Sequence, residues 1–167
     1  ILFSDIVGFT RTVEALGGNL EALKGHLTGA LDAVAEVHRK HDLIIDKFIG
    51  DAVMSFRGGD LVDGAPSEHA YRVVRAAIES VTALEKLNDP YFNQIKIGGA
   101  SSESALIGAF GTSTRLTYTV LGDRVNLAAR LEASVKQCRV SNLFCDRTFA
   151  LTKDRKDILW RRFGQLK

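Results

Sequence analysis

The sequence predicts an α+β domain in which helices return over one face of a mainly antiparallel sheet. Amphipathic helical patterns alternate with β-rich segments, and several of those segments follow one another without a helix between them. Strands joined in this way pair antiparallel, which argues against a doubly wound fold. The 167 residues, 46% of them hydrophobic, suit a single domain over 1–167 with a full core.

The chain opens with an apolar segment over 1–9 that predicts a strand. Asn19 then precedes apolar residues spaced 3-4-3-4 over 20–37, which is the pattern of a long amphipathic helix. Because the first residues already belong to a strand, and the last ones form a basic run, we expect the chain to be a fragment of a longer protein.

Two β-rich segments follow the first helix and predict a hairpin. They lie near 43–49 and 52–57, and the Gly-Asp pair at 50–51 is the signature of a two-residue turn. Ser67 is a candidate N-cap for a second amphipathic helix, which the Asn-Asp-Pro sequence at 88–90 ends. We therefore expect an antiparallel pair and a second helix packed on it.

The second half of the chain predicts strands, a helix and a less regular tail. The segments, in order, are strands QIKIGGA (94–100), ALIGAFG (105–111) and RLTYTVLG (115–122), a helix over 123–136 capped by Asp123, a short helix within 141–152, and a strand in LWRRFGQLK (159–167).

Composition excludes several functions. The net charge of +2 comes from interspersed acidic and basic residues, which gives no electrostatic case for nucleic-acid binding. No apolar run approaches the roughly 20 residues of a membrane span, and no signal-peptide pattern leads the chain. Cys138 and Cys145 fit neither a zinc site nor a disulfide framework. We therefore expect no membrane contact from this segment. We also expect a cytoplasmic location, and this holds too if the segment is the cytoplasmic domain of a membrane-anchored protein.

Two aspartates stand where strands end. Asp5 follows an apolar run at the start of the chain, and Asp51 occupies the tip of the hairpin. Hard divalent cations such as Mg²⁺ take one or two carboxylates, with water and substrate phosphates as further ligands. Two converging aspartates would supply that number. The alternative is that Asp51 is an ordinary turn residue and Asp5 a capping acid, and the pattern alone leaves both open.

A polar pair lies on the predicted helix over 123–136. Asn126 and Arg130 are four residues apart, so they share one helix face, offset from the buried stripe. The arginine fork suits phosphate oxygens, and an asparagine can position a hydroxyl or a ribose. The alternative is that Arg130 pairs with a surface acid.

Three segments together resemble a known family. FSDIVGFT (3–10), DKFIGDAVMSF (46–56) and YTVLGDRVNLAARLE (118–132) are similar, in order and spacing, to the signature blocks of class III nucleotide cyclase catalytic domains. The resemblance covers nearly the whole chain. It implies a ferredoxin-like α+β sandwich, a head-to-tail homodimer with composite sites, and conversion of ATP to 3′,5′-cyclic AMP and pyrophosphate with two divalent cations, Mg²⁺ or Mn²⁺.

The resemblance assigns metal-binding and catalytic roles. Asp5 and Asp51 match the two metal-binding aspartates, with the backbone carbonyl of Ile6 as an added ligand. Asn126 and Arg130 match the residues that position the ribose and stabilise charge on the transferring phosphorus. We expect these two sets to meet across the dimer interface.

The family resemblance also assigns substrate contacts. Backbone amides of Gly8, Phe9 and Thr10 suit the β- and γ-phosphates. Lys47 and Thr119 match the two base-specifying positions. A lysine can only donate a hydrogen bond. Adenine is therefore favoured, because its N1 accepts, whereas guanine N1 carries a hydrogen. The Thr119 hydroxyl can accept from the adenine amino group but can also donate, so it excludes guanine poorly. Without the resemblance, Lys47 would be interpreted as an exposed charged residue on a strand.

Some features depart from the family or leave alternatives. A lysine that meets the terminal phosphates follows the family's final strand, and this chain stops at Lys167, before that place. The threonine at the second base position is similar to a bacterial subclass that often responds to bicarbonate. A guanylate or mixed-specificity cyclase, and a catalytically silent dimerisation domain, are the alternatives. A fused sensor domain would lie outside this chain.

Overall fold

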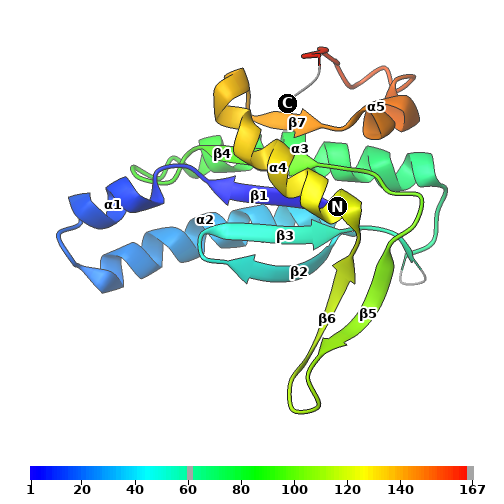
Figure 1. The fold of residues 1–167 in the computed structure, drawn as a ribbon. Coiled ribbons are helices and arrows are strands. Elements are labelled where there is room, and N and C mark those ends of the chain that lie inside the picture. The colour runs from blue at the N-terminus through cyan, green and yellow to red at the C-terminus, as the bar shows by residue number, and fades with distance from the viewer. Residues whose placement is uncertain (60–61, 165–167) are drawn as a thin grey trace.

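A five-stranded sheet forms the centre of the molecule in a computed structural model that describes residues 1–59 and 62–164 (Figure 1). Its strand order is β2-β3-β1-β4-β7, and every neighbouring pair is antiparallel except β4–β7. The strands are β1 (Leu2–Ile6), β2 (Ile44–Ile49), β3 (Ala52–Phe56), β4 (Ile95–Gly99) and β7 (Asn142–Phe144). The predicted hairpin is confirmed, since Ile49 pairs with Ala52 across the turn.

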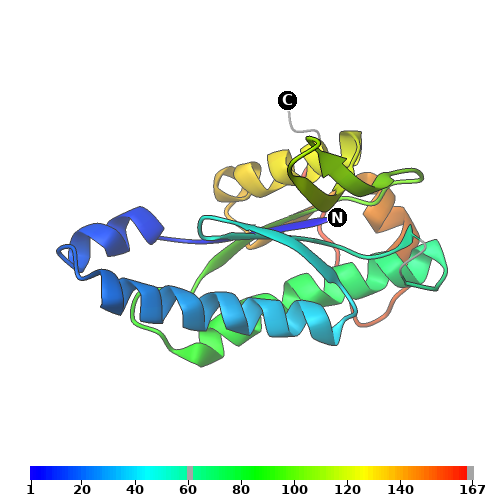
Figure 2. The same ribbon diagram turned by 90° about the horizontal axis from the view of Figure 1, so that it is seen from below.

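Helices cover both faces of this sheet. Figure 2 shows α2 (Leu20–Lys40) and α3 (Pro66–Leu87) on one side and α4 (Asp123–Cys138) on the other. The predicted α+β class is confirmed, but the expectation that the helices share one face is wrong. In the part of the chain that the structure describes, no helix is both long and apolar enough to cross a membrane.

The second helical face exists because the sheet buries apolar side chains in both directions. Leu2 is fully buried against α2 and α3, and its neighbour Phe3 points to the opposite side, where it packs against α4. Gly98 lets α4 approach closely: a Cβ there would lie 2.1 Å from the amide nitrogen of Glu132 and 2.3 Å from the carbonyl oxygen of Ala128. Any side chain at this position would push α4 off β4.

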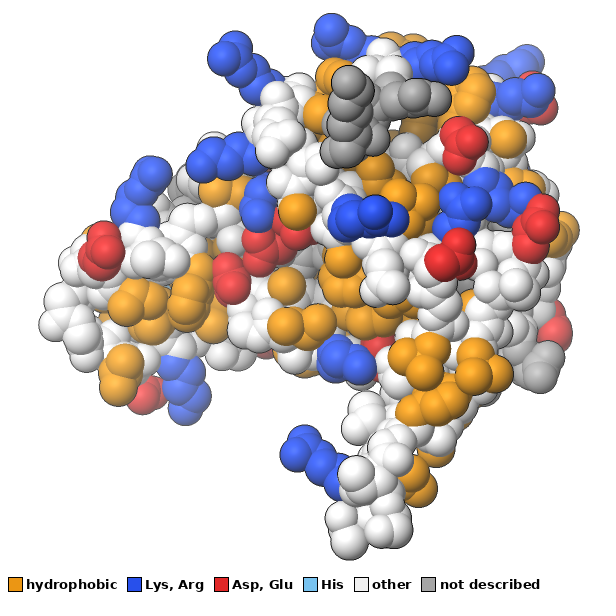
Figure 3. Space-filling view, viewed as in Figure 1, with side chains coloured by type: hydrophobic (Ala, Val, Ile, Leu, Met, Phe, Trp, Pro, Cys, Tyr) orange, Lys and Arg blue, Asp and Glu red, His pale blue; other side chains and the backbone are white. Residues whose placement is uncertain are grey.

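A separate two-stranded hairpin projects from the body (Figure 1). It consists of β5 (Leu106–Gly111) and β6 (Leu116–Leu121), paired antiparallel as the sequence predicts. Large apolar side chains remain exposed on it: Leu106, Leu116, Tyr118 and Leu121. Figure 3 shows hydrophobic side chains gathered where this hairpin leaves the body. A monomer rarely leaves so many large apolar residues in water without an interaction partner.

The predicted helix caps are only partly confirmed. Asn19 caps α2, and its side chain accepts a hydrogen bond from the amide of Ala22 at 3.1 Å. Ser67 does not cap α3, because Pro66 already occupies the first helical turn, where its fixed φ and missing N–H suit the helix start. Asp123 is likewise inside α4, since Gly122 is the N-cap.

The C-terminal part also differs from the prediction. Within 141–152 the structure has α5 (Asp146–Thr152), as expected, preceded by β7, which the pattern did not indicate. The strand predicted over 159–167 is not formed in the described residues 159–164, and the remaining positions lie outside the described residues. A strand needs a neighbour to satisfy its backbone groups, and β7 pairs with β4 instead.

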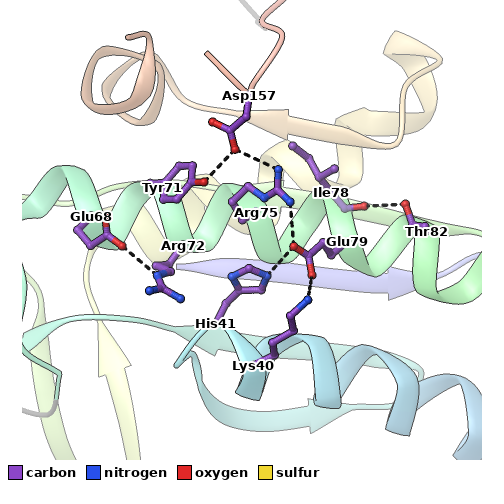
Figure 4. Close-up of polar contacts among 10 residues, drawn as sticks. All are labelled: Lys40, His41, Glu68, Tyr71, Arg72, Arg75, Ile78, Glu79, Thr82 and Asp157. Atoms are coloured by element: carbon purple, nitrogen blue, oxygen red, sulfur yellow. Dashed lines mark hydrogen bonds and ion pairs between the residues drawn. The ribbon is translucent and has the colours of Figure 1, made fainter. Parts of the chain in front are cut away.

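Charged side chains join α2, α3 and the segment after α5 (Figure 4). Glu79 on α3 pairs with Lys40 at 2.6 Å, Arg75 at 3.0 Å and His41 at 3.1 Å. Arg75 in turn pairs with Asp157 at 3.1 Å. Burial alone would raise the pKa of Glu79, but the bonds from its three partners outweigh burial and lower the pKa to about 2.

Candidate active site

Both predicted metal-binding aspartates line one cavity of about 970 Å³ at the end of β1 and the start of β3. Asp5 pairs with Ala52 across the two strands, so Asp51, which precedes Ala52, lies beside the last residues of β1. The predicted residues that line this cavity are Asp5, Ile6, Gly8, Phe9, Thr10 and Asp51. Sheet register therefore brings together two aspartates that are 46 positions apart in the sequence.

Gly8 makes the turn from β1 into α1 (Phe9–Ala15). Its φ of 98° lies in the left-handed region that a side chain disfavours. The carbonyl of Gly8 accepts hydrogen bonds from the backbone amide of Thr12 at 2.9 Å and from its hydroxyl at 3.0 Å. These contacts hold the backbone of Phe9 and Thr10 along the cavity wall.

Lys96 is the cation that pairs with Asp5. Its ammonium lies 2.6 Å from Asp5 Oδ2 and 2.8 Å from Glu132 Oε1. Burial raises the pKa of Asp51, and the negative charge of Asp5 raises it further, although Lys96 opposes the rise. For Lys96 itself, burial lowers the pKa, but the bonds to Asp5 and Glu132 outweigh it and the net pKa is raised. Lys96 therefore offsets part of the negative charge of the two aspartates, and Arg11, Lys136 and Arg139 also line the cavity.

The donor set of this cavity fits a hard divalent cation. Asp5 and Asp51 offer carboxylate oxygens close enough for one to raise the pKa of the other, so a bound cation would relieve their repulsion. Among residues 1–59 and 62–164 no group of three or more His, Cys, Asp or Glu side chains is placed to hold a metal. A two-carboxylate site completed by water and substrate phosphates is the mode that Mg²⁺ prefers.

Lys47 and Thr119 meet in a second place on the molecule. Lys47 on β2 donates a hydrogen bond to the Thr119 hydroxyl on β6, with 3.2 Å between the atoms. The hydroxyl in turn donates to Asp46 Oδ2 at 2.6 Å. The structure thus joins the two residues that the sequence paired only through the family resemblance, and it adds an aspartate to them.

Asn126 and Arg130 lie on the exposed side of α4. The helix buries Ala128, Leu131 and Val135 against the sheet, which leaves the predicted polar pair facing outward. Neither residue is among the described residues that line the aspartate cavity. Within one chain, the structure therefore does not bring this pair to the aspartates.

Sequence reasoning missed Lys96, Glu132 and Asp46. Lys96 stands between two buried isoleucines in its strand, a pattern that indicates a side chain on the other face of the sheet but not its partner. Its position opposite Asp5 depends on the pairing of β1 with β4. Glu132 reaches the same place from α4. These contacts could have been found only with the strand order known.

The fold and this arrangement of sites define a domain of the class III nucleotide cyclase type. The chain belongs to the family of adenylate and guanylate cyclase catalytic domains, whose family model matches residues 1–157. The expected resemblance is therefore confirmed.

Individual relatives agree with this assignment. The chain is 32% identical over 157 residues to adenylate cyclase 1 of Rhizobium meliloti (strain 1021), which covers 92% of this chain but only 23% of that protein. The crystal structure of the adenylyl cyclase CyaB from P. aeruginosa superimposes with a TM-score of 0.79 at 32% identity, covering 92% of this chain and 79% of that one. The guanylyl cyclase Cya2 superimposes with a TM-score of 0.81 at 27% identity, covering 99% and 83%.

Proposed function

We propose that this chain is the catalytic domain of an adenylate cyclase that converts ATP to 3′,5′-cyclic AMP and pyrophosphate. The observation that carries the proposal is the 3.2 Å contact between Lys47 and Thr119, which places an ammonium donor beside a hydroxyl acceptor. Adenine offers the matching pair, an acceptor at N1 and an amino donor beside it. The similarity to adenylate cyclase 1 of R. meliloti supports the same base.

We propose that the active site forms between two copies of the chain arranged head to tail. The aspartate cavity and the Asn126–Arg130 pair lie apart in one chain, so a complete site needs a second subunit. One subunit would supply Asp5 and Asp51, and its partner the base-reading residues and the α4 pair. The exposed apolar side chains of the β5–β6 hairpin support such an association.

Asp5, Asp51 and the backbone carbonyl of Ile6 would hold two divalent cations, Mg²⁺ or Mn²⁺. When bound, such cations favour the deprotonated ribose 3′-hydroxyl and neutralise phosphate oxygens. The raised pKa of Asp51, caused by burial and by the neighbouring charge of Asp5, supports this assignment.

The other residues position and stabilise the reacting groups. Asn126 orients the ribose, so that its 3′-oxygen forms a bond to the α-phosphorus as the bond to the β-phosphate oxygen breaks and pyrophosphate leaves. Arg130 stabilises the charge that grows on the equatorial oxygens. The backbone around Gly8 and the ammonium of Lys96 lie in the cavity that would take the terminal phosphates. The 3′-hydroxyl proton is released to solvent.

Regulation and location are part of the same proposal. The R. meliloti relative extends far beyond the matched segment, which supports a sensor or regulatory domain fused outside this chain. Cys138 and Cys145 are free thiols, and ATP is an intracellular nucleotide, which supports a cytoplasmic location.

A guanylate or mixed-specificity cyclase is the second candidate. Cya2, a guanylyl cyclase, has the same fold, and a threonine hydroxyl can donate as well as accept. A catalytically silent domain is disfavoured because both aspartates, Asn126 and Arg130 are all present.

One assay tests the proposal. The purified protein is incubated with Mn²⁺ or Mg²⁺ and either ATP or GTP, and the cyclic products are separated and quantified. We expect cyclic AMP to dominate, and the Asp51→Ala variant to serve as the inactive control. Production of cyclic GMP alone would establish the second candidate, and no product from a demonstrated dimer would favour the silent domain.

A further inference from the structure

A β-bulge turns two consecutive residues of β2 toward the same side chain. Ile45 pairs with Ser55 and Lys47 with Met54, so Asp46 is an extra residue in the strand. Successive strand residues normally point to opposite faces, and a bulge removes that alternation locally. As a result, both Asp46 and Lys47 reach the Thr119 hydroxyl, at 2.6 Å and 3.2 Å.

The Asp46 carboxylate is in an unusually enclosed position. Its side chain is 0% exposed, and Thr119 is 6% exposed. Asp46 Oδ2 lies 3.6 Å from the Lys47 ammonium, and Asp46 Oδ1 is buried with no hydrogen-bond partner within the described part of the chain. A buried carboxylate with one unpaired oxygen costs free energy, so packing alone gives no reason for its presence.

The carboxylate decides what the Thr119 hydroxyl can do. A hydroxyl has one proton to donate and two lone pairs that accept. The proton is directed to Asp46, and one lone pair accepts from Lys47, which leaves one lone pair. A carboxylate cannot donate, so Thr119 can turn its proton elsewhere only by abandoning this bond. Toward a purine, Thr119 is therefore an acceptor.

We propose that Asp46 is a specificity-determining residue that positions the Thr119 hydroxyl so that it accepts from the amino group of adenine and rejects guanine. Guanine carries a carbonyl oxygen, O6, where adenine carries its amino group, so two acceptors would face each other. This inference rests on the proposed function, and it answers how a threonine that could also donate discriminates between the two bases. Asp46 acts through Thr119 and does not touch the base.

The Asp46→Asn variant tests the role with little change in shape. Its amide can donate to Thr119, which frees the hydroxyl proton for guanine O6. We expect the ratio of kcat/KM for ATP to that for GTP to fall about tenfold, the size of one hydrogen bond in a buried site, mainly through a lower KM for GTP. Asp89→Asn is the matched control, because Asp89 is also a mostly buried, hydrogen-bonded aspartate but belongs to the loop after α3, where it pairs with His26 of α2. Its ratio should not change.

A double-mutant cycle separates positioning from structural damage. In the Thr119→Val background the hydroxyl is absent, so Asp46→Asn should change the ATP:GTP ratio less than about twofold. Two outcomes would overturn the inference while the proposed function stands. One is that Asp46→Asn lowers turnover equally with both nucleotides. The other is that Asp46→Asn lowers the ATP:GTP ratio as much in the Thr119→Val background as in the wild type. Competition of ATP and GTP against a fluorescent ATP analogue gives the corresponding ratio of binding affinities. A wild-type protein that neither cyclises nor binds either nucleotide would overturn the proposed function and this inference together.

Discussion

Lys96 Nζ lies 2.6 Å from Asp5 Oδ2 and 2.8 Å from Glu132 Oε1, so one ammonium group links β1 to α4. The contact crosses the β1–β4 pair, in which Asp5 stands opposite Lys96. If Asp5 binds a divalent cation as proposed, this ammonium would compete with the cation for the carboxylate, and it would also be placed to pair with a triphosphate.

Replacing this lysine should strengthen metal binding in the absence of nucleotide. In the Lys96→Met variant the repulsion between the ammonium and the cation is gone, and we expect Mn²⁺ to bind about tenfold more tightly, since charges a few ångströms apart near a surface interact by ~1 kcal/mol or more. Calorimetric titration with Mn²⁺ alone measures the change. Lys136→Met is the control, because Lys136 lines the same cavity from α4. Weaker Mn²⁺ binding in Lys96→Met would contradict competition.

The two aspartates should be required for turnover but not for folding. We expect Asp5→Ala and Asp51→Ala each to lower metal-dependent kcat by about a thousandfold or more, since a lost metal ligand removes several kcal/mol of transition-state stabilisation. Neither side chain contributes to the apolar clusters, so the melting temperature should change little. Near-normal turnover in either variant would exclude a site that uses both residues.

Arg130 should act in the transition state. If its contact with the phosphorus oxygens strengthens as charge grows, Arg130→Ala lowers kcat about a hundredfold or more and changes KM little. Steady-state kinetics with ATP measure both constants. Gln137→Ala, an exposed position on the same helix, controls for damage to α4. A change confined to KM would assign Arg130 to binding alone.

Mixing two inactive variants tests the composite site. One carries Asp5→Ala with Asp51→Ala, and the other Asn126→Ala with Arg130→Ala. A mixed dimer would rebuild one intact site of two, and random pairing makes about half the dimers mixed, so activity should return to roughly a quarter of wild type per total protein. Subunit exchange is checked by light scattering or affinity capture of a tagged chain. Exchange without recovered activity would show that both residue sets work within one chain.

The ion-pair cluster around Glu79 should make stability depend on acid pH. The folded-state pKa of Glu79 is about 2, below its ordinary value of 4.5. Its contribution is therefore fully present above pH 4.5 and is lost as the pH falls toward 2. We expect Glu79→Gln to lower the free energy of unfolding at pH 7 by about 1 kcal/mol, or ~2–4 °C in Tm, and by less at pH 3. Glu36→Gln, an exposed carboxylate on α2, should change neither.

Local patterns in the sequence were sufficient for many elements and for the candidate residues. The 3-4 spacing of apolar residues predicts α2, and the Gly-Asp turn predicts the β2–β3 hairpin, because both depend on neighbours within a few positions. Asp5 and Asp51 could be singled out because each lies at or beside the end of a recognisable strand. The family resemblance added roles for Lys47, Thr119 and the α4 pair.

Only the tertiary structure decided which of these residues meet. Strand order placed Lys96 opposite Asp5, and the small size of Gly98 let α4 settle on the second face of the sheet, which turns Asn126 and Arg130 away from the aspartates. The bulge that aims Asp46 at Thr119 arises from one extra residue in the register of two strands. Periodicity in a single chain segment carries no information about its partner across a sheet, so pairing, register and close approach emerge only when the whole core packs.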